Sequence, residues 1–126
     1  MNRSALQVLF VALALLLSGC IEQPGRAAAG QAARGSAFNG QHLIFSYGCG
    51  TCHVIPGISE ADGTTGPPLT GFASRLYIAG VLTNEPAHLI EWLENPQQIV
   101  ADNAMPNLGI TEQQARDIAA YLYTLR

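Results

Sequence analysis

Lysine is absent from this sequence, and only 12% of its 126 residues are charged. Five arginines and nine carboxylates follow Cys20, which gives that part of the chain a net charge of −4. Proteins that bind nucleic acid neutralise its phosphates with many lysines and arginines. We therefore expect no nucleic-acid partner for this mildly acidic chain.

The chain has a single long apolar run, over residues 5–17, and one positive charge precedes it at Arg3. A membrane-spanning helix needs about 20 apolar residues, so this run is too short and is typical of a signal peptide. It ends in Leu-Ser-Gly-Cys, which resembles the lipobox of bacterial lipoproteins. We predict removal of residues 1–19 and a lipid on Cys20, which would anchor the protein to a membrane in the bacterial periplasm. The alternative is ordinary secretory cleavage, with Cys20 left as a free thiol.

Cysteine is scarce, with three residues in all. If Cys20 carries a lipid, Cys49 and Cys52 remain. Two cysteines cannot make a disulfide framework, and no second Cys-x-x-Cys pair exists to complete a four-sulfur zinc site.

The segment at residues 20–36 is rich in Ala, Gly and Gln and has no large apolar residue after Ile21. It cannot build a core, and we interpret it as a tether between the lipid and a folded domain at residues 37–126. A flexible segment of about 16 residues has a root-mean-square reach of roughly 20–24 Å.

Three helices are predicted in this domain, over residues 38–50, 83–96 and 111–126, so the fold class is all-α. Thr83 or Asn84 is the expected cap of the second helix, and Pro96 is expected to end it. The third has a capping box, with Thr111 at its start and Gln114 three residues later, ahead of an apolar stripe.

A stretch rich in Gly and Pro, residues 54–80, separates the first two helices without any sustained period. So long a loop in so small a domain is usually functional or wraps around something. A large planar cofactor would give this loop a surface to pack on.

The segment Cys49-Gly-Thr-Cys52-His53 supports three chemistries. A redox dithiol is expected after a strand, and no strand pattern precedes Cys49. A zinc site would have to recruit His42 or His88, at no recognised spacing. The third is covalent haem attachment, in which two cysteines three apart bond the vinyl groups and the adjacent imidazole reaches the iron. We favour one covalent haem c.

With this motif the chain resembles the single-haem class I cytochromes c, over essentially the whole domain. Phe45 lies four residues before the first cysteine, where an aromatic is usual in that family. Gly40 lies five before Phe45, one further than the family glycine that contacts the C-terminal helix. Gly-Pro-Pro-Leu, residues 66–69, looks like the family loop whose carbonyl accepts a hydrogen bond from the histidine, with Pro67 as the acceptor. The resemblance implies three main helices and long loops around the haem.

The sixth iron ligand is expected to be Met105, the single methionine after the signal peptide. Its segment, Trp-Leu-Glu-Asn-Pro followed nine residues later by Met-Pro, resembles the mitochondrial cytochrome pattern. His42 and His88 are the rival ligands. Trp92 is expected to pack near the porphyrin. Arg75 is a candidate partner for a haem propionate. The alternatives are that Trp92 is an ordinary core residue and that Arg75 is an ordinary surface residue.

A haem held by His and Met has no open position, so the expected function is electron transfer and not catalysis. Residues 66–99 are similar to the cytochrome c domain fused to subunit II of some bacterial haem-copper oxidases. The implied partner is such an oxidase or another membrane redox complex. Two alternatives stay open: an electron acceptor subunit of a periplasmic dehydrogenase, and a haem sensor or peroxidase with an open sixth position.

Overall fold

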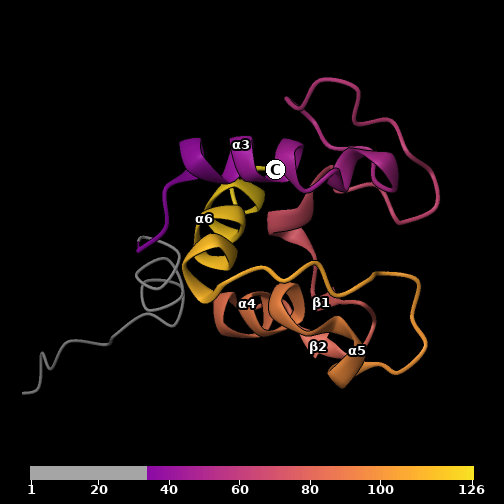
Figure 1. Cartoon of the computed structure of the whole chain (residues 1–126). Coiled ribbons are helices and arrows are strands. Elements are labelled where there is room, and N and C mark those ends of the chain that lie inside the picture. The colour runs from indigo at the N-terminus through magenta and orange to yellow at the C-terminus, as the bar shows by residue number, and fades with distance from the viewer. Residues whose placement is uncertain (1–33) are drawn as a thin grey trace, which may run out of the picture.

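The first and last described helices cross each other, and a third helix packs on the other side of the last one (Figure 1). The computed structural model describes residues 34–126. In chain order, with the labels of Figure 1, its elements are α3 (Ala37–Ser46), the 3-10 turns η1 (Cys49–Thr51) and η2 (Phe72–Ser74), strands β1 (Tyr77–Ile78) and β2 (Leu82–Thr83), and helices α4 (Pro86–Glu94), α5 (Pro96–Ile99) and α6 (Glu112–Leu122).

Helix α6 is the centre of the core. Thr111 and Gln114 form the predicted capping box, with Thr111 Oγ1 accepting from the Gln114 backbone N–H. The apolar positions of α6 recur at helical spacing and face α3 and α4, which buries them almost completely. These buried residues are Ala115, Ile118, Ala119 and Leu122.

The α3–α6 crossing depends on Gly40. A Cβ atom placed on this residue would lie 2.0 Å from the backbone oxygen of Asp117. No side chain fits there, so the two helix backbones approach each other closely. Gly40 lies one residue further from Phe45 than the family pattern has it, and this does not alter the crossing. Phe45 points away from α6 and is 59% exposed.

The entry of the chain into α3 is fastened to α6. The backbone N–H of Ser36 donates to Asp117 Oδ1 at 2.8 Å, and Ser36 Oγ caps α3 by accepting from the Asn39 N–H. A Cβ on Gly35 would lie 2.1 Å from the backbone oxygen of Arg116. Gly35 and Ser36 thus already contact α6, although both precede the predicted start of the domain at residue 37.

The second helix begins later than predicted, and it ends just before Pro96, as expected. It begins after Glu85, whose side chain makes no capping hydrogen bond. The predicted cap Asn84 does not bond to the helix, because its side chain donates to the backbone oxygens of Phe72 and Arg75. The helix ends at Glu94, and Pro96 is the first residue of the short helix α5. Proline is accepted there because the first position of a helix needs no N–H donor.

The long loop at residues 54–80 folds back onto the segment before it and includes structure that the sequence did not predict. The strands β1 and β2 pair antiparallel, Tyr77 with Thr83 and Ile78 with Leu82. Their tight turn has positive φ at Ala79 and Gly80.

Within residues 34–126, no helix is both long enough and apolar enough to cross a membrane. The predicted signal peptide and Cys20 lie outside the described residues, as does most of the predicted tether.

Candidate haem site

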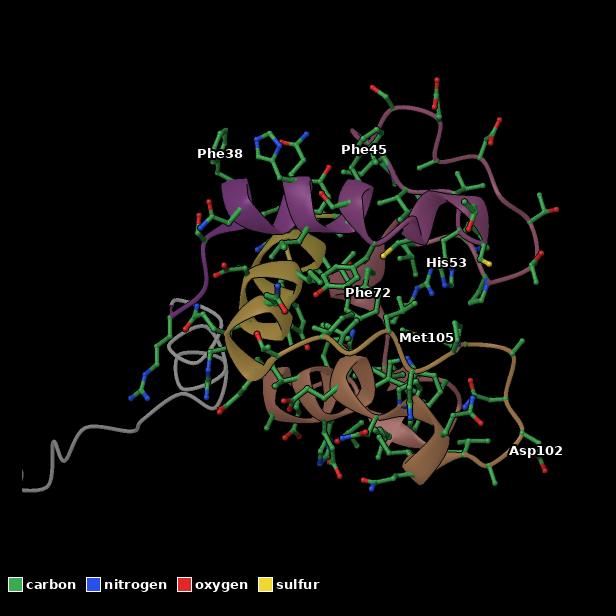
Figure 2. All side chains as sticks on the ribbon, viewed as in Figure 1. Phe38, Phe45, His53, Phe72, Asp102 and Met105 are labelled. Carbon is green, nitrogen blue, oxygen red and sulfur yellow. The ribbon has the colours of Figure 1, made fainter. Side chains whose placement is uncertain are left out.

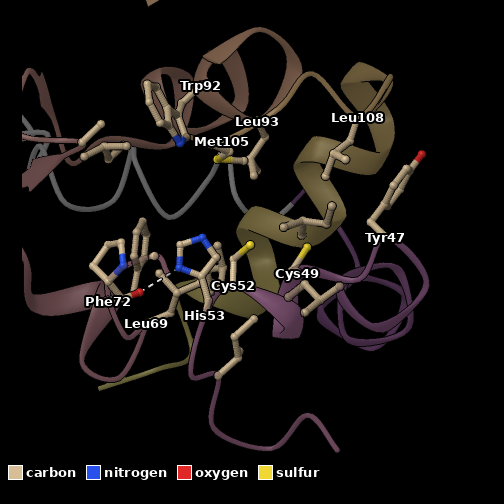
Figure 3. Close-up of a pocket in the computed structure, with 18 of the residues that line it drawn as sticks. Tyr47, Cys49, Cys52, His53, Leu69, Phe72, Trp92, Leu93, Met105 and Leu108 are labelled. Atoms are coloured by element: carbon tan, nitrogen blue, oxygen red, sulfur yellow. Dashed lines mark hydrogen bonds between the residues drawn. The ribbon is translucent and has the colours of Figure 1, made fainter. Parts of the chain in front are cut away.

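A cavity of about 360 Å³ lies between the Cys-His segment and the loop that follows α5 (Figure 3). Cys49, Cys52 and His53 line one wall, and Met105 lies on the wall opposite. Among the described residues that line it, Arg75 is the one full charge. Most of the others are apolar, including Leu69, Phe72, Ile78, Leu89 and Leu93. The cavity wall is thus mostly apolar, and it brings together all the residues expected at a haem.

The Cys-His segment is held by the loop that returns after it. The Cys52 carbonyl accepts from the Gly66 N–H at 2.7 Å, and the Gly50 carbonyl accepts from the Gly63 N–H at 3.0 Å. The turn η1 spans the residues between the two cysteines, so both sulfurs point into the cavity (Figure 3). The loop that the sequence left without structure therefore fixes the spacing of the two thiols.

His53 is oriented by two residues of the Gly-Pro-Pro-Leu loop. Its Nδ1 lies 2.7 Å from the carbonyl oxygen of Pro67, the acceptor expected from the sequence (Figure 3). A carbonyl only accepts, so Nδ1 carries the proton and Nε2 of the neutral ring has a lone pair for a metal. A Cβ on Gly66 would lie 2.3 Å from His53 Cε1, so the ring packs directly on the backbone of that residue. The hydrogen bond from Nδ1 to the Pro67 carbonyl orients a histidine ligand and strengthens it as a donor.

Met105 is held from α5 and from its own loop. Its carbonyl accepts from Gln97 Nε2 at 2.8 Å, and its N–H donates to Asn103 Oδ1 at 2.8 Å. Asn103 Nδ2 in turn donates to the carbonyl oxygens of Pro96 and Val100. The thioether is thus placed by a backbone that cannot move independently of α5.

Trp92 and Arg75 both line the cavity, where the sequence placed them. Trp92 comes from α4, on the side of Met105 (Figure 3). The Arg75 guanidinium donates to the carbonyl oxygens of Pro68 and Thr70 and lies 5.8 Å from the centre of the Phe72 ring. Arg75 therefore fastens the loop that carries Pro67, and its expected contact with a haem propionate stays a prediction.

The competing chemistries have less support in this geometry. Burial raises the pKa of the Cys49 thiol, the charge of Cys52 acts in the same direction, and a backbone hydrogen bond opposes them. A dithiol oxidoreductase needs the pKa of its attacking cysteine lowered. In the described part of the chain, no three His, Cys, Asp or Glu residues converge as a metal site would require.

Neither of the rival histidine ligands lines the cavity. His42 is exposed on α3, and His88 Nδ1 lies 2.9 Å from Thr83 Oγ1.

Three supporting residues of the site were missed by sequence reasoning: Gly66, Gln97 and Asn103. Gly66 could have been found, because it opens the loop that supplies the histidine acceptor. Asn103 precedes Met105 by two residues, which is the spacing of an Asx turn. Gln97 gave no signal, since its contact with Met105 depends on a short helix that was not expected.

The whole domain matches a protein-family model described as cytochrome c, over residues 37–126. The chain belongs to the cytochrome c family. Its curated relatives include cytochrome c oxidase subunit 2 of Bacillus sp. (strain PS3), at 31% identity over 87 residues. This match covers 66% of the present chain and 24% of that relative, so the chain spans about a quarter of the relative's length.

Family membership confirms three expectations: the all-α class I fold, one covalently bound haem c, and electron transfer as the activity. A cytochrome c carries one electron at a time on its haem iron. In this chain the haem would be held by the residues that line the cavity, most of which are apolar.

Proposed function

We propose that this cytochrome c is a membrane-tethered electron carrier of the bacterial periplasm and that it donates electrons to a terminal cytochrome oxidase. The observation that carries the proposal is the position of Met105 on the cavity wall opposite His53. A ligand from each wall leaves no open position for a substrate, which favours an electron carrier over a sensor or a peroxidase.

In this proposal Cys49 and Cys52 would hold the haem through thioether bonds, and His53 Nε2 and the sulfur of Met105 would be the iron ligands. Soft thioether sulfur stabilises ferrous iron and raises the reduction potential. The contacts of His53 with Pro67 and of Met105 with Asn103 are made within the protein. These contacts would hold both ligands in place in either oxidation state, which would keep the reorganisation that accompanies electron transfer small.

The oxidase partner is supported by the similarity to cytochrome c oxidase subunit 2 of Bacillus sp. (strain PS3). The membrane anchor is supported by the lipobox pattern that ends at Cys20. A lipid there, followed by a short tether, would hold the domain at high effective concentration beside partners embedded in the same membrane.

The exposed rim of the cavity is uncharged, which favours docking to a partner through uncharged contacts. Seven residues that line the cavity are exposed, and none of them is charged: Thr51, Thr65, Pro67, Tyr77, Ala79, Ala104 and Pro106. A chain without lysine cannot present a basic ring for long-range steering. We infer that the uncharged rim meets the partner, with confinement at the membrane replacing electrostatic steering.

The ligand assignment is tested by Met105→Ala in the haem-loaded protein. The reduced wild type should bind no carbon monoxide at neutral pH. The variant should bind it, lose the weak near-infrared sulfur-to-iron band of the oxidised form, and show a lower reduction potential. Asn107→Ala is the control, because it truncates an exposed residue of the same loop.

Carbon monoxide binding by the wild type would support an open-site sensor or peroxidase instead. An unchanged near-infrared band in Met105→Ala would disprove Met105 as the ligand. Covalent attachment is checked separately, since acidified organic solvent should leave the haem bound to the denatured chain.

A further inference from the structure

Helix α3 presents aromatic side chains on the side that faces away from α6. Phe38 is 70% exposed and Phe45 is 59% exposed. His42, between them in sequence, is also exposed, and its ring meets that of Phe38 edge-on, with centroids 4.7 Å apart. The spacing i, i+4, i+7 puts all three on one side of the helix. Figure 2 shows Phe38 and Phe45 projecting outward from the ribbon. We call these three residues the aromatic face.

The haem does not explain the aromatic face, because none of its residues lines the cavity. Core packing does not explain it either, since α3 already contacts α6 through Gly40 and Ile44 on its opposite side. Exposing a phenylalanine side chain to water is energetically unfavourable. Two of them on one solvent-facing side of a helix therefore indicate a surface that binds another molecule or a membrane.

The position of the aromatic face along the chain indicates what covers it. Helix α3 is the first described element after the predicted tether, and a flexible segment from Ile21 to Ser36 would have a root-mean-square length of about 20–24 Å. The aromatic face is therefore confined close to the membrane whenever Cys20 carries a lipid. Helix α3 contains no Asp, Glu, Lys or Arg, although the chain as a whole has nine carboxylates. Aromatic side chains on an amphipathic surface favour the boundary between headgroups and acyl chains.

We propose that the aromatic face lies in the interfacial zone of the lipid bilayer and sets the orientation of the domain on the membrane. This inference rests on the proposed acylation of Cys20. A lipid on a tether restrains distance and leaves the domain free to rotate, whereas a second contact through α3 fixes which side faces the lipid.

The orientation has a consequence for the cavity. His53 and Met105 lie on the other side of α3 from Phe38 and Phe45 (Figure 2). With the aromatic face on the bilayer, the uncharged rim of the cavity stays clear of lipid and is free to meet a membrane-embedded partner.

The experiment measures membrane contact with a nitroxide label on the full, haem-loaded mature protein. Thioether bonds occupy Cys49 and Cys52 and the lipid occupies Cys20, so one introduced cysteine is the single reactive thiol. His42→Cys places the label on the aromatic face. Ala87→Cys places it on an exposed site of α4, beyond α6 from α3. The reduced protein is anchored in phosphatidylethanolamine–phosphatidylglycerol vesicles, and each label is compared for its accessibility to oxygen and to a water-soluble nickel chelate.

The label at residue 42 should favour oxygen over nickel, and the label at residue 87 should not. The double substitution Phe38→Ser with Phe45→Ser should abolish the preference at residue 42 and leave the haem spectrum unchanged, because both side chains are mostly exposed. Equal accessibility at residues 42 and 87 in the anchored protein would overturn the inference. So would immobilisation of the label at residue 42 without vesicles, since a protein segment or a second copy would then cover the aromatic face.

Failure of the lipid anchor gives a different result. If Cys20 is not acylated, the parent protein without an introduced cysteine takes up the label, and Cys20→Ala prevents this. The same two labels, in a Cys20→Ala background, are then compared after vesicles are added to the unanchored protein. An oxygen preference at residue 42 there would still support membrane contact, and its absence would contradict it.

Discussion

Gly66 leaves the imidazole of His53 no room to move. A Cβ on this residue would lie 2.3 Å from Cε1 and 2.6 Å from Nδ1 of the ring, while the same ring is held by the Pro67 carbonyl at 2.7 Å. The His53 ring is thus positioned by the hydrogen bond of Nδ1 with the Pro67 carbonyl and by close packing against the Gly66 backbone.

Gly66→Ala should therefore displace the ring and weaken its bond to the iron. We expect a loss of about 1–3 kcal/mol in the free energy of unfolding, as for other overpacked sites. The haem spectrum should also change, which a merely structural defect elsewhere would not cause. Denaturant unfolding and absorption spectroscopy check this. Thr65→Ala is the control, because it removes atoms from an exposed neighbour and adds none. A variant with wild-type stability and spectrum would contradict the role given to Gly66.

At the scale of the elements, two opposing effects determine the result of replacing Gly40 at the α3–α6 crossing: helix propensity and steric clash. Alanine in place of a helical glycine gains roughly 1 kcal/mol of helix propensity. The added Cβ would lie 2.0 Å from the Asp117 carbonyl oxygen, a backbone atom that no rotamer change can move away.

Gly40→Ala should lower the free energy of unfolding, because the clash forces the two helices apart over their whole contact. A net loss of about 1–3 kcal/mol is expected. Asn39→Ala, on an exposed position of the same helix, should instead stabilise the protein slightly. Thermal or urea unfolding measures both. Stabilisation by both substitutions would show that the crossing has room for a methyl group.

The same elements show what the sequence could predict. The capping box of α6 and the Cys-His segment are local patterns, and local patterns identify a helix start and an attachment site without knowledge of the fold. The N-terminal cap of α4 was mispredicted because the Asn84 side chain bonds to the backbone of Phe72 and Arg75, distant in sequence, and not to its own helix. The support of Met105 by Gln97 was missed for the same reason, since it exists only after α5 has formed. The roles of Asn84 and Gln97 thus depend on contacts between segments, which a local sequence pattern cannot predict.

At the scale of the whole molecule, Tyr123 joins the C-terminal end to the middle of the chain. Its hydroxyl donates to Asn84 Oδ1 at 2.9 Å, and its ring packs edge-on against Phe72. Burial, together with the nearby charge of Glu85, raises the pKa of Tyr123 from its ordinary value of 10.0 to about 12. Burial also raises the pKa of Tyr121.

The raised pKa of Tyr123 makes stability depend on alkaline pH. The unfolded chain loses this proton near pH 10, whereas the folded protein keeps it until about pH 12. The stabilising contribution is therefore complete below pH 10 and is lost as the pH rises towards 12. Tyr123→Phe should cost about 1 kcal/mol at neutral pH through the lost hydrogen bond. Its free energy of unfolding should then fall less than that of the wild type between pH 10 and 12. Urea unfolding followed by circular dichroism tests this, and parallel pH profiles would contradict it.

Electron transfer to the partner is a further property of the whole molecule. With no lysine and an uncharged cavity rim, the rate in native membranes should change little between low and moderate ionic strength. Deleting residues 22–33 should slow it substantially, because the proposed tether would then be too short to span the distance to the proposed partner. The deletion stops before Gly35 and Ser36, which contact α6. A Gly-Ser segment of equal length is the control and should restore the rate. A steep fall with salt, and no effect of the deletion, would contradict docking by confinement.

The bond between Ser36 N–H and Asp117 Oδ1 would also receive any mechanical load from the proposed anchor. A domain tethered at Cys20 would be pulled at the residue where the tether joins the fold. That force would pass from Ser36 into α6 at the α3–α6 crossing, where Gly40 brings the two helix backbones together. Neither the Cys-His segment nor the Met105 loop takes part in the Ser36–Asp117 bond, so the proposed anchor would load the helix crossing first.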